Sequence, residues 1–184
     1  MRIIAGDAKG RKIEAPSGLQ TRPTLDRVRE NMFNMLQRSI SGGKVLDLFA
    51  GSGALSLEAI SRGAASAVMV DHDRHAIDIQ RKNIETLSYT DRILQHHCDW
   101  EKAIEQLKNE EKKFDLVFLD PPYSFRATEK VFMALKPLLE QEAIVVLEHS
   151  SKDRISIPAG YSIFKERSWG YCAVSMYRAE QEGV

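Results

Sequence analysis

The sequence predicts an α/β fold with a mostly parallel seven-stranded sheet, helices on both faces and an antiparallel C-terminal strand. From residue 44 onward, short apolar runs of strand length alternate with stretches that repeat apolar residues at helical spacing. Near the C-terminal end, two strand-like runs flank Ser168-Trp169-Gly170, which is typical of a hairpin. The length of 184 residues suits one compact domain.

Seven segments have the composition of strands. The fourth is nearly all apolar, and Pro121-Pro122 ends it because proline has no backbone N–H to donate. Alternation with helices implies right-handed crossovers and a sheet that is covered on both faces. In chain order, the predicted strands are residues 45–49, 67–71, 92–97, 114–119, 143–147, 161–166 and 171–177.

Five segments have helical periodicity, and the first of them carries an apolar stripe that includes Val28 and Met32. Before it, residues 2–5 and 11–14 are expected to pair as a small hairpin. We therefore divide the chain into an N-terminal hairpin-and-helix extension, residues 1–40, and a main domain, residues 41–184. The predicted helices are residues 24–40, 54–61, 74–87, 100–109 and 127–139.

Composition excludes several classes of protein. Apolar residues make up 43% of the chain and charged residues 28%, which argues against a disordered chain. No apolar run has the length of a membrane helix, and the first residues lack the apolar core of a signal peptide. Cys98 and Cys172 are the two cysteines, so a disulfide scaffold is not expected. We expect a cytoplasmic protein without a membrane partner.

The formal net charge of zero hides an uneven distribution. Residues 1–40 carry a net charge of +4, residues 41–120 carry −4, and the remainder is neutral. A neutral total speaks against a nucleic-acid partner, whereas a basic N-terminal arm beside a more acidic core is compatible with one.

Acidic residues and glycines gather where the predicted strands end. The first strand leads into Asp47-Leu48-Phe49-Ala50-Gly51-Ser52-Gly53, Asp71 ends the second strand, and Asp99 follows the third. Ligands of such sheets bind outside the carboxyl ends of the strands, and glycine lets a ligand approach the backbone. A carboxylate at Asp71 can accept both ribose hydroxyl hydrogens. Asp99 can accept from an adenine amino group or serve as the N-cap of the next helix.

Two classes of cofactor compete for this site. A dinucleotide site has the pattern G-x-G-x-x-G, but its third glycine position is Ser56 here. Asp47 would repel a pyrophosphate, whereas its negative charge suits a cofactor with an ammonium group. S-adenosylmethionine carries a sulfonium and an amino group but no phosphate, so the pattern favours it. A purely structural turn is the alternative for the two glycines.

The most specific motif is Asp120-Pro121-Pro122-Tyr123, directly after the fourth strand. Its prolines stiffen the loop and leave carbonyl groups as acceptors. A carboxylate and a proline carbonyl can hold both hydrogens of a planar exocyclic amine, and Tyr123 offers a ring on which a base can stack. Held in this way, the nitrogen can turn its lone pair toward a methyl group. The base must leave its stack to reach such a pocket.

These motifs resemble those of known enzymes. Residues 47–53 resemble motif I of class I S-adenosylmethionine-dependent methyltransferases, which have a Rossmann-like fold. Residues 120–123 resemble the Asp/Asn-Pro-Pro-Tyr/Phe motif of enzymes that methylate exocyclic amines. Residues 2–6, 9–12 and 21–30 resemble the bacterial small-subunit rRNA guanine-N2 methyltransferase family, and this similarity covers essentially the whole chain.

The resemblance implies methyl transfer from S-adenosylmethionine to the N2 amine of a guanine in 16S rRNA within an assembling 30S subunit. We expect a monomer that needs no metal. The predicted cofactor-binding residues are Asp47, Phe49, Gly51, Gly53, Asp71 and Asp99. The predicted catalytic residues are Asp120, Pro121, Pro122 and Tyr123. The predicted RNA-binding residues are Arg22, Arg27 and Arg29.

Several alternatives stay open from the sequence. The chain could methylate DNA or another RNA amine such as adenine N6, or it could be an RNA-binding module without catalysis. His96, His97 and Cys98 do not supply four metal ligands at a familiar spacing. Arg27 and Arg29 could be solvated helix charges or internal ion-pair partners instead of RNA contacts.

Overall fold

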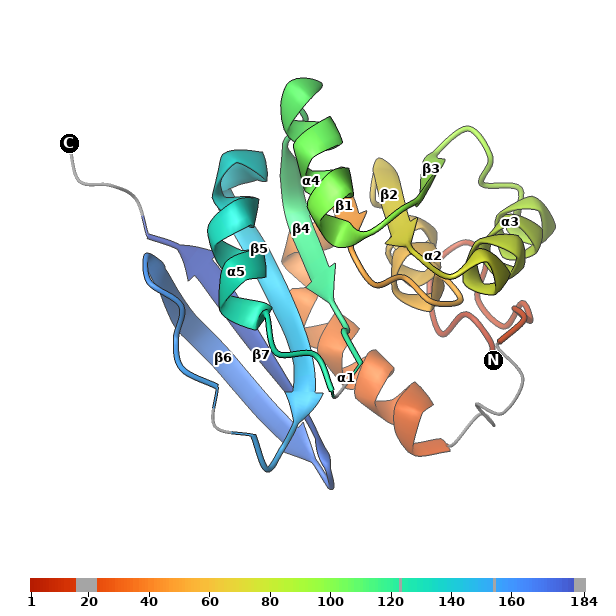
Figure 1. Cartoon of the computed structure of the whole chain (residues 1–184). Helices are drawn as coiled ribbons and strands as arrows, with labels where there is room; N and C mark the ends of the chain where they lie inside the picture. Colours follow the sequence, from red (N-terminus) through yellow and green to blue (C-terminus); the bar gives the residue numbers. More distant parts are fainter. Residues whose placement is uncertain (16–22, 123, 154, 181–184) are drawn as a thin grey trace.

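The computed structural model describes residues 1–15, 23–122, 124–153 and 155–180. Its centre is a seven-stranded sheet with the order β3-β2-β1-β4-β5-β7-β6 (Figure 1). In chain order, the elements are α1 (Pro23–Ile40), β1 (Lys44–Asp47), α2 (Ala54–Ser61), β2 (Ser66–Asp71), α3 (Arg74–Leu87), β3 (Ile93–His97), α4 (Trp100–Asn109), β4 (Phe114–Leu119), α5 (Thr128–Leu135), the 3-10 turn η1 (Lys136–Leu138), β5 (Leu139–Ser150), β6 (Tyr161–Trp169) and β7 (Cys172–Ala179).

Two apolar layers enclose the sheet. Alternate residues along each strand point to opposite faces, so Val45 and Leu46 of β1 belong to different cores. Helices α1, α2 and α3 cover one face, and α4 and α5 cover the other (Figure 1). The five strands β1 to β5 run parallel, so their carboxyl ends lie along one edge of the sheet.

The C-terminal hairpin completes the sheet with one antiparallel strand. β7 lies between β5 and β6 and runs antiparallel to both, with Val146 of β5 opposite Met176. This confirms the antiparallel C-terminal strand that the sequence predicted. The insertion of the last strand between the two preceding ones depends on long-range pairing, which the local pattern does not contain.

Several boundaries differ from the sequence-based expectations; for example, β6 and β7 run to Trp169 and Ala179 instead of residues 166 and 177. The fifth predicted helix ends at Leu135 instead of residue 139, because Pro137 lacks an N–H and the chain tightens into η1. β5 therefore starts at Leu139 and is longer than the predicted segment. β1 ends at Asp47, two residues earlier than predicted. The predicted N-terminal hairpin is reduced to a single antiparallel bridge between Arg2 and Lys12.

The N-terminal arm, residues 1–15, packs on α2 and is not a separate unit. Its apolar residues, such as Ile3 and Ile13, join the same core as α1 and α2. The carboxylate of Glu58 is fully buried and accepts the backbone N–H groups of Ile4 and Ala5 at 2.8 and 3.0 Å. Since Glu58 belongs to α2, this contact ties the arm directly to the helix that follows the glycine turn. None of the described helices is both long and apolar enough to cross a membrane.

Candidate active site

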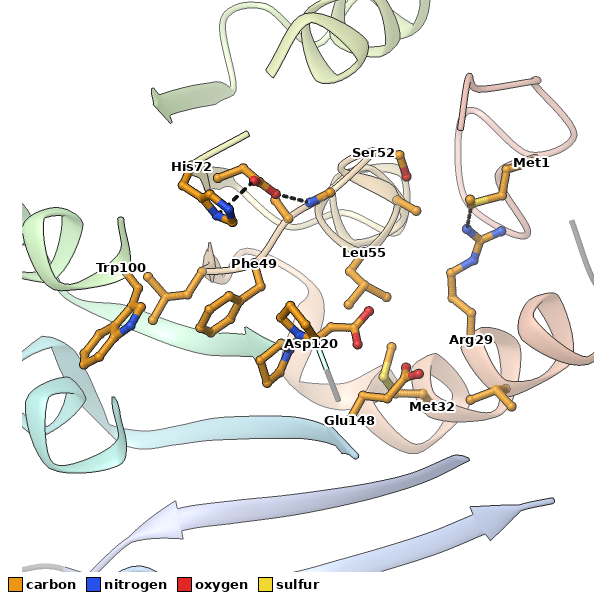
Figure 2. A pocket seen from close by; sticks show the side chains of 18 of the residues that line it. Met1, Arg29, Met32, Phe49, Ser52, Leu55, His72, Trp100, Asp120 and Glu148 are labelled. Carbon is orange, nitrogen blue, oxygen red and sulfur yellow. Dashed lines mark hydrogen bonds and ion pairs between the residues drawn. The ribbon is translucent and has the colours of Figure 1, made fainter. Parts of the chain in front are cut away.

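One pocket of about 520 Å³ opens at the carboxyl edge of the parallel strands (Figure 2). Its volume is typical of sites that bind small molecules. Every parallel strand contributes to its wall, either at its own end or through the loop that follows it. The N-terminal extension closes the pocket from the side. The residues that line the pocket include Met1, Asp26, Arg29, Met32, Phe49, Gly51, Asp71, Asp99, Trp100, Asp120, Pro121, Pro122 and Glu148.

The glycine turn between β1 and α2 exposes its backbone to this pocket. Gly51 has φ +52°, and a Cβ atom at this position would meet nothing within 4 Å, so a ligand can approach the main chain closely. Gly53 has φ +80° and packs against Met69, where a Cβ atom would lie 2.9 Å from the sulfur. The turn is held from α3, where the buried Gln80 donates from Nε2 to the Gly51 carbonyl at 3.0 Å.

Two predicted cofactor carboxylates line the pocket. Asp71 accepts the Gly51 N–H at 2.8 Å through Oδ2 and the Asp73 N–H at 2.9 Å through Oδ1. Each oxygen keeps a further lone pair for a ribose hydroxyl. Asp99 occupies the N-cap position of α4, but its side chain makes no capping hydrogen bond to a described residue. Its exposed carboxylate is therefore available to the pocket.

Asp47 lies behind the pocket wall, and its side chain does not line the pocket. It is buried, and Oδ2 accepts from the Ser56 hydroxyl at 3.0 Å. Oδ1 is buried without a hydrogen-bond partner among the described residues. Burial, aided by the nearby Asp71, raises the pKa of Asp47 to about 7. An unsatisfied buried carboxyl behind the glycine turn favours a positively charged ligand on the other side.

An aromatic cluster forms one wall of the pocket. Phe49 follows β1, lines the pocket and contacts the ring of Phe125 edge-on, with ring centroids 5.2 Å apart. Phe125 also contacts Trp100 edge-on at 6.4 Å. These rings give the site a rigid apolar wall suited to a flat ring system. The sequence pointed to Phe49, but Phe125 was missed because it follows the proline motif in a loop without periodicity.

The Asp-Pro-Pro loop continues the pocket wall beside Phe49 (Figure 2). The Phe125 N–H donates to the Pro122 carbonyl at 2.7 Å and makes the loop a tight turn. Asp120, Pro121 and Pro122 all line the pocket, as the motif predicted. Tyr123 lies outside the described residues, so its stacking role stays a prediction.

Glu148, near the end of β5, is a second carboxylate beside Asp120 and was missed in the sequence. Figure 2 shows both side chains directed into the same part of the pocket. Asp120 is exposed to the open pocket, but the protein around the pocket floor desolvates it. This desolvation, together with the charges of Glu148 and Asp47, raises its pKa well above the usual range. Burial also raises the pKa of Glu148. The acid-after-strand pattern that pointed to the other carboxylates applies equally to Glu148.

Arg29 of α1 faces the pocket from the arm side and is buried, with 6% of its surface exposed. Its guanidinium donates to Asp26 at 3.1 Å and to the Arg2 carbonyl at 2.5 Å. It also donates to the Met1 sulfur at 3.1 Å (Figure 2). These contacts correct the expectation of a surface RNA contact, because they place Arg29 as an internal ion-pair partner. Arg29 thereby holds the start of the chain against the pocket.

Other basic groups of the extension do reach the surface. Arg27 is exposed on α1, next to the helix residues that line the pocket. Arg22 lies outside the described residues. The exposed basic side chains of the described extension are Arg2, Lys9, Arg11, Lys12 and Arg27. Among the residues that the structure describes, no group of three or more His, Cys, Asp or Glu side chains is arranged to hold a metal ion.

The doubly wound sheet, the glycine turn and the Asp-Pro-Pro loop define a class I S-adenosylmethionine-dependent methyltransferase. A family model described as conserved hypothetical protein 95 matches residues 1–178. Ribosomal RNA small subunit methyltransferase D of Escherichia coli (strain K12) is 35% identical over 187 residues, covering 100% of this chain and 92% of that protein. The chain belongs to the family of ribosomal RNA small subunit methyltransferase D.

Solved structures agree with this assignment. The Escherichia coli protein yhhF superposes with a TM-score of 0.84 at 36% identity, covering 98% of both chains. A hypothetical protein of Thermus thermophilus superposes with a TM-score of 0.82 at 26% identity, covering 98% of this chain and 99% of that one. The similarity includes the N-terminal extension and the main domain alike.

The methyl donor is S-adenosylmethionine, and the residues present fit it. Asp71 and Asp99 offer carboxylates for ribose and adenine, and the Phe49 cluster offers an apolar wall. The unsatisfied Oδ1 of Asp47 lies behind the turn where the cationic end of the cofactor would approach.

Proposed function

We propose that this enzyme transfers a methyl group to the exocyclic N2 amine of a guanine in 16S rRNA, acting as a monomer on an assembling 30S subunit. The observation that carries the proposal is the Asp-Pro-Pro loop, which faces the same pocket as the cofactor carboxylates. The second support is the basic extension, which reaches from the pocket wall to the exposed Arg27.

Asp120 and a proline carbonyl hold the two hydrogens of the amine in this proposal. S-adenosylmethionine, when bound, would supply the methyl group from its sulfonium. The bond between that methyl carbon and sulfur breaks, and the sulfur is left as a neutral thioether. The amine nitrogen uses its lone pair for the new N–C bond, and one of its hydrogens leaves as a proton. The pKa of Asp120 is raised, so its ionised carboxylate is a stronger base than that of an ordinary aspartate. Asp120 is therefore suited to orient the amine and to accept that proton.

Two alternatives predict different products. An adenine-N6 enzyme would place methyl groups on adenine of DNA or RNA. An RNA-binding module without catalysis would take up no S-adenosylmethionine, which isothermal calorimetry measures directly. The cofactor-shaped pocket favours an enzyme over a binding module.

The proposed function is tested by tritiated methyl transfer to 30S particles from a strain that lacks this methyltransferase. We expect the label to appear as N2-methylguanosine after nucleoside analysis of the 16S rRNA. Naked 16S rRNA serves as the comparison and is expected to be a poorer substrate. Label in N6-methyladenosine would reject the guanine assignment.

Cofactor affinity is expected to depend on pH through Asp47. Because its folded-state pKa is about 7, the carboxyl is mostly neutral at pH 5.5 and largely ionised at pH 8. A cationic ligand favours the ionised form, so the affinity for S-adenosylmethionine should rise by about three- to tenfold between pH 5.5 and 7. Calorimetric titrations measure this slope, and Asp47→Asn should flatten it. An equal slope in both proteins would contradict the role of Asp47.

RNA binding is expected to depend on Arg27 more than on Arg29. Arg27→Ala should lower the affinity for 30S particles a few-fold and reduce the slope of log affinity against log salt by about one, as expected for one lost phosphate contact. Arg167→Ala, on the exposed edge strand β6, is the matched control. Filter binding at several salt concentrations measures the affinity and its salt dependence for both variants. An unchanged slope in the Arg27 variant would remove this residue from the interface.

A further inference from the structure

The pocket contains a carboxylate that the proposed chemistry does not use. Glu148 lies near the carboxyl end of β5, is half-buried and lines the pocket on the same side as Asp120 and Met32 (Figure 2). Its backbone is fixed inside the sheet, opposite Val174 of β7. A side chain that starts from a paired central strand is held more precisely than one on a loop.

The surroundings leave Glu148 with unused acceptor capacity. Its carboxylate receives a hydrogen bond from the thiol of Cys172, which is a weak donor. Within the described part of the chain, no lysine or arginine forms an ion pair with Glu148, and Arg29 is already engaged by Asp26 and the Arg2 carbonyl. Among the described residues, the two carboxylates therefore share one pocket without a lysine or arginine paired to either of them. Such an arrangement favours a neutral ligand that presents several N–H donors side by side.

The bases differ in the hydrogens that they present. Guanine presents three along one edge, two on N2 and one on N1, and both nitrogens are bonded to C2. Adenine and cytosine also carry an amine, but the neighbouring ring nitrogen has a lone pair in place of a hydrogen. A carboxylate beside the amine-binding site attracts the guanine N1–H and repels that lone pair. The difference is large because one polar atom is left unpaired in the wrong complex.

We propose that Glu148 accepts the N1–H of the target guanine and thereby selects guanine over adenine and cytosine. This role rests on the proposed function, since it assigns the amine itself to Asp120 and a proline carbonyl. Three acceptors then meet the three hydrogens of the guanine edge. Glu148 is a specificity residue that contacts the base, and it takes no part in the transfer of the methyl group.

The test compares guanine with 2-aminopurine, which keeps the N2 amine but has a lone pair at N1. Particles are reconstituted from 16S rRNA that carries either base at the position that the wild-type enzyme methylates. The wild type should prefer guanine by about ten- to a hundredfold in kcat/KM, the size expected for a hydrogen bond to a charged acceptor. Glu148→Gln should reduce this ratio to about one, because an amide can accept from N1–H or donate to a bare N1.

Controls separate this role from a structural one. Glu142→Gln makes the same change at an exposed position of the same strand and should keep the wild-type ratio. Glu148→Asp keeps the charge and should keep a preference for guanine. Since Glu148 raises the pKa of Asp120, Glu148→Gln should also shift the acidic limb of the rate profile to lower pH. Thermal unfolding and calorimetry with S-adenosylmethionine verify that each variant is folded and binds the cofactor.

The outcomes distinguish the two proposals. N2-methylguanosine from the wild type together with an unchanged base preference in Glu148→Gln would overturn the role of Glu148 alone. N6-methyladenosine from the wild type would overturn both the role of Glu148 and the proposed function. Collapse of the preference in Glu148→Gln, with Glu142→Gln unaffected, would establish the assignment.

Discussion

Replacing Asp120 by alanine is expected to reduce methyl transfer at least 100-fold while cofactor affinity stays within about threefold of the wild type. Asp120, Asp71 and Asp99 all line the pocket, and the proposed function assigns Asp120 to the amine and the other two to the cofactor. The variant loses the group that orients the amine, so its loss falls on the rate of the transfer step. Single-turnover transfer to 30S particles measures that rate, and calorimetry measures cofactor binding.

Asp120→Asn separates two contributions of the carboxylate. The amide keeps an oxygen that can hold one amine hydrogen, but it is not a base at neutral pH. If orientation is the main contribution, Asp120→Asn should retain most of the rate that Asp120→Ala loses. If proton acceptance dominates, both variants should be equally slow. Weak cofactor binding with normal turnover at saturation would contradict a catalytic role for Asp120.

The rate of the wild type should also fall as the pH is lowered through the raised pKa of Asp120. The ionised form is the one that accepts a hydrogen from the amine, and burial with Glu148 and Asp47 nearby favours the neutral form. The acidic limb of the profile is therefore expected at a higher pH than for an ordinary aspartate. This limb should be absent in Asp120→Asn.

Replacing Gly6 by alanine is expected to detach the N-terminal arm from α2. Gly6 has φ +87°, and a Cβ atom there would lie 1.7 Å from the carbonyl oxygen of Ser61. The Ser61 carbonyl at the end of α2 accepts the Asp7 N–H at 2.9 Å, so neither group can move aside without breaking the contact that docks the arm. Undocking exposes the buried Glu58, which loses the N–H groups of Ile4 and Ala5. We expect a loss of about 3 kcal/mol or more in the free energy of unfolding, measured in urea.

Gly10→Ala is the matched control for this prediction. Gly10 has φ +82°, but a Cβ atom there would meet nothing within 4 Å. Gly10→Ala should lower the free energy of unfolding by only about 1 kcal/mol, which is the cost of a left-handed conformation alone. Trypsin should cut the detached arm after Lys9 or Arg11 faster in the Gly6 variant than in the control. Similar losses in both variants would show that backbone strain, and not the close contact with Ser61, makes glycine necessary at position 6.

The arm also matters for the substrate side of the pocket. Met1 lines the pocket, and the Arg2 carbonyl accepts from the buried Arg29. A detached arm removes both contacts from the wall near Glu148. We therefore expect Gly6→Ala to impair transfer to 30S particles more than it impairs binding of S-adenosylmethionine.

Local patterns in the sequence were sufficient for most of the fold and for the edge of the sheet at which the pocket opens. Buried parallel strands are continuous apolar runs, and their carboxyl ends meet at one edge, so Asp71, Asp99 and Asp120 could be placed together from the sequence alone. Family resemblance added the expected substrate. The strand pattern and the family motifs are both carried by residues that are close to one another in the chain.

Other features depend on contacts between distant segments. Whether Arg29 meets RNA or the Arg2 carbonyl depends on the docking of the arm, which Glu58 of α2 stabilises. Asp47 ends β1 two residues before the predicted end of the strand, and it lies behind the pocket wall because its side chain turns toward Ser56. The sequence by itself determined the order of strands and helices and the edge at which ligands bind, since periodicity and turn residues act locally. Only the tertiary structure decided that β7 lies between β5 and β6 and that Glu148 joins Asp120, because long-range pairing and packing set these distances.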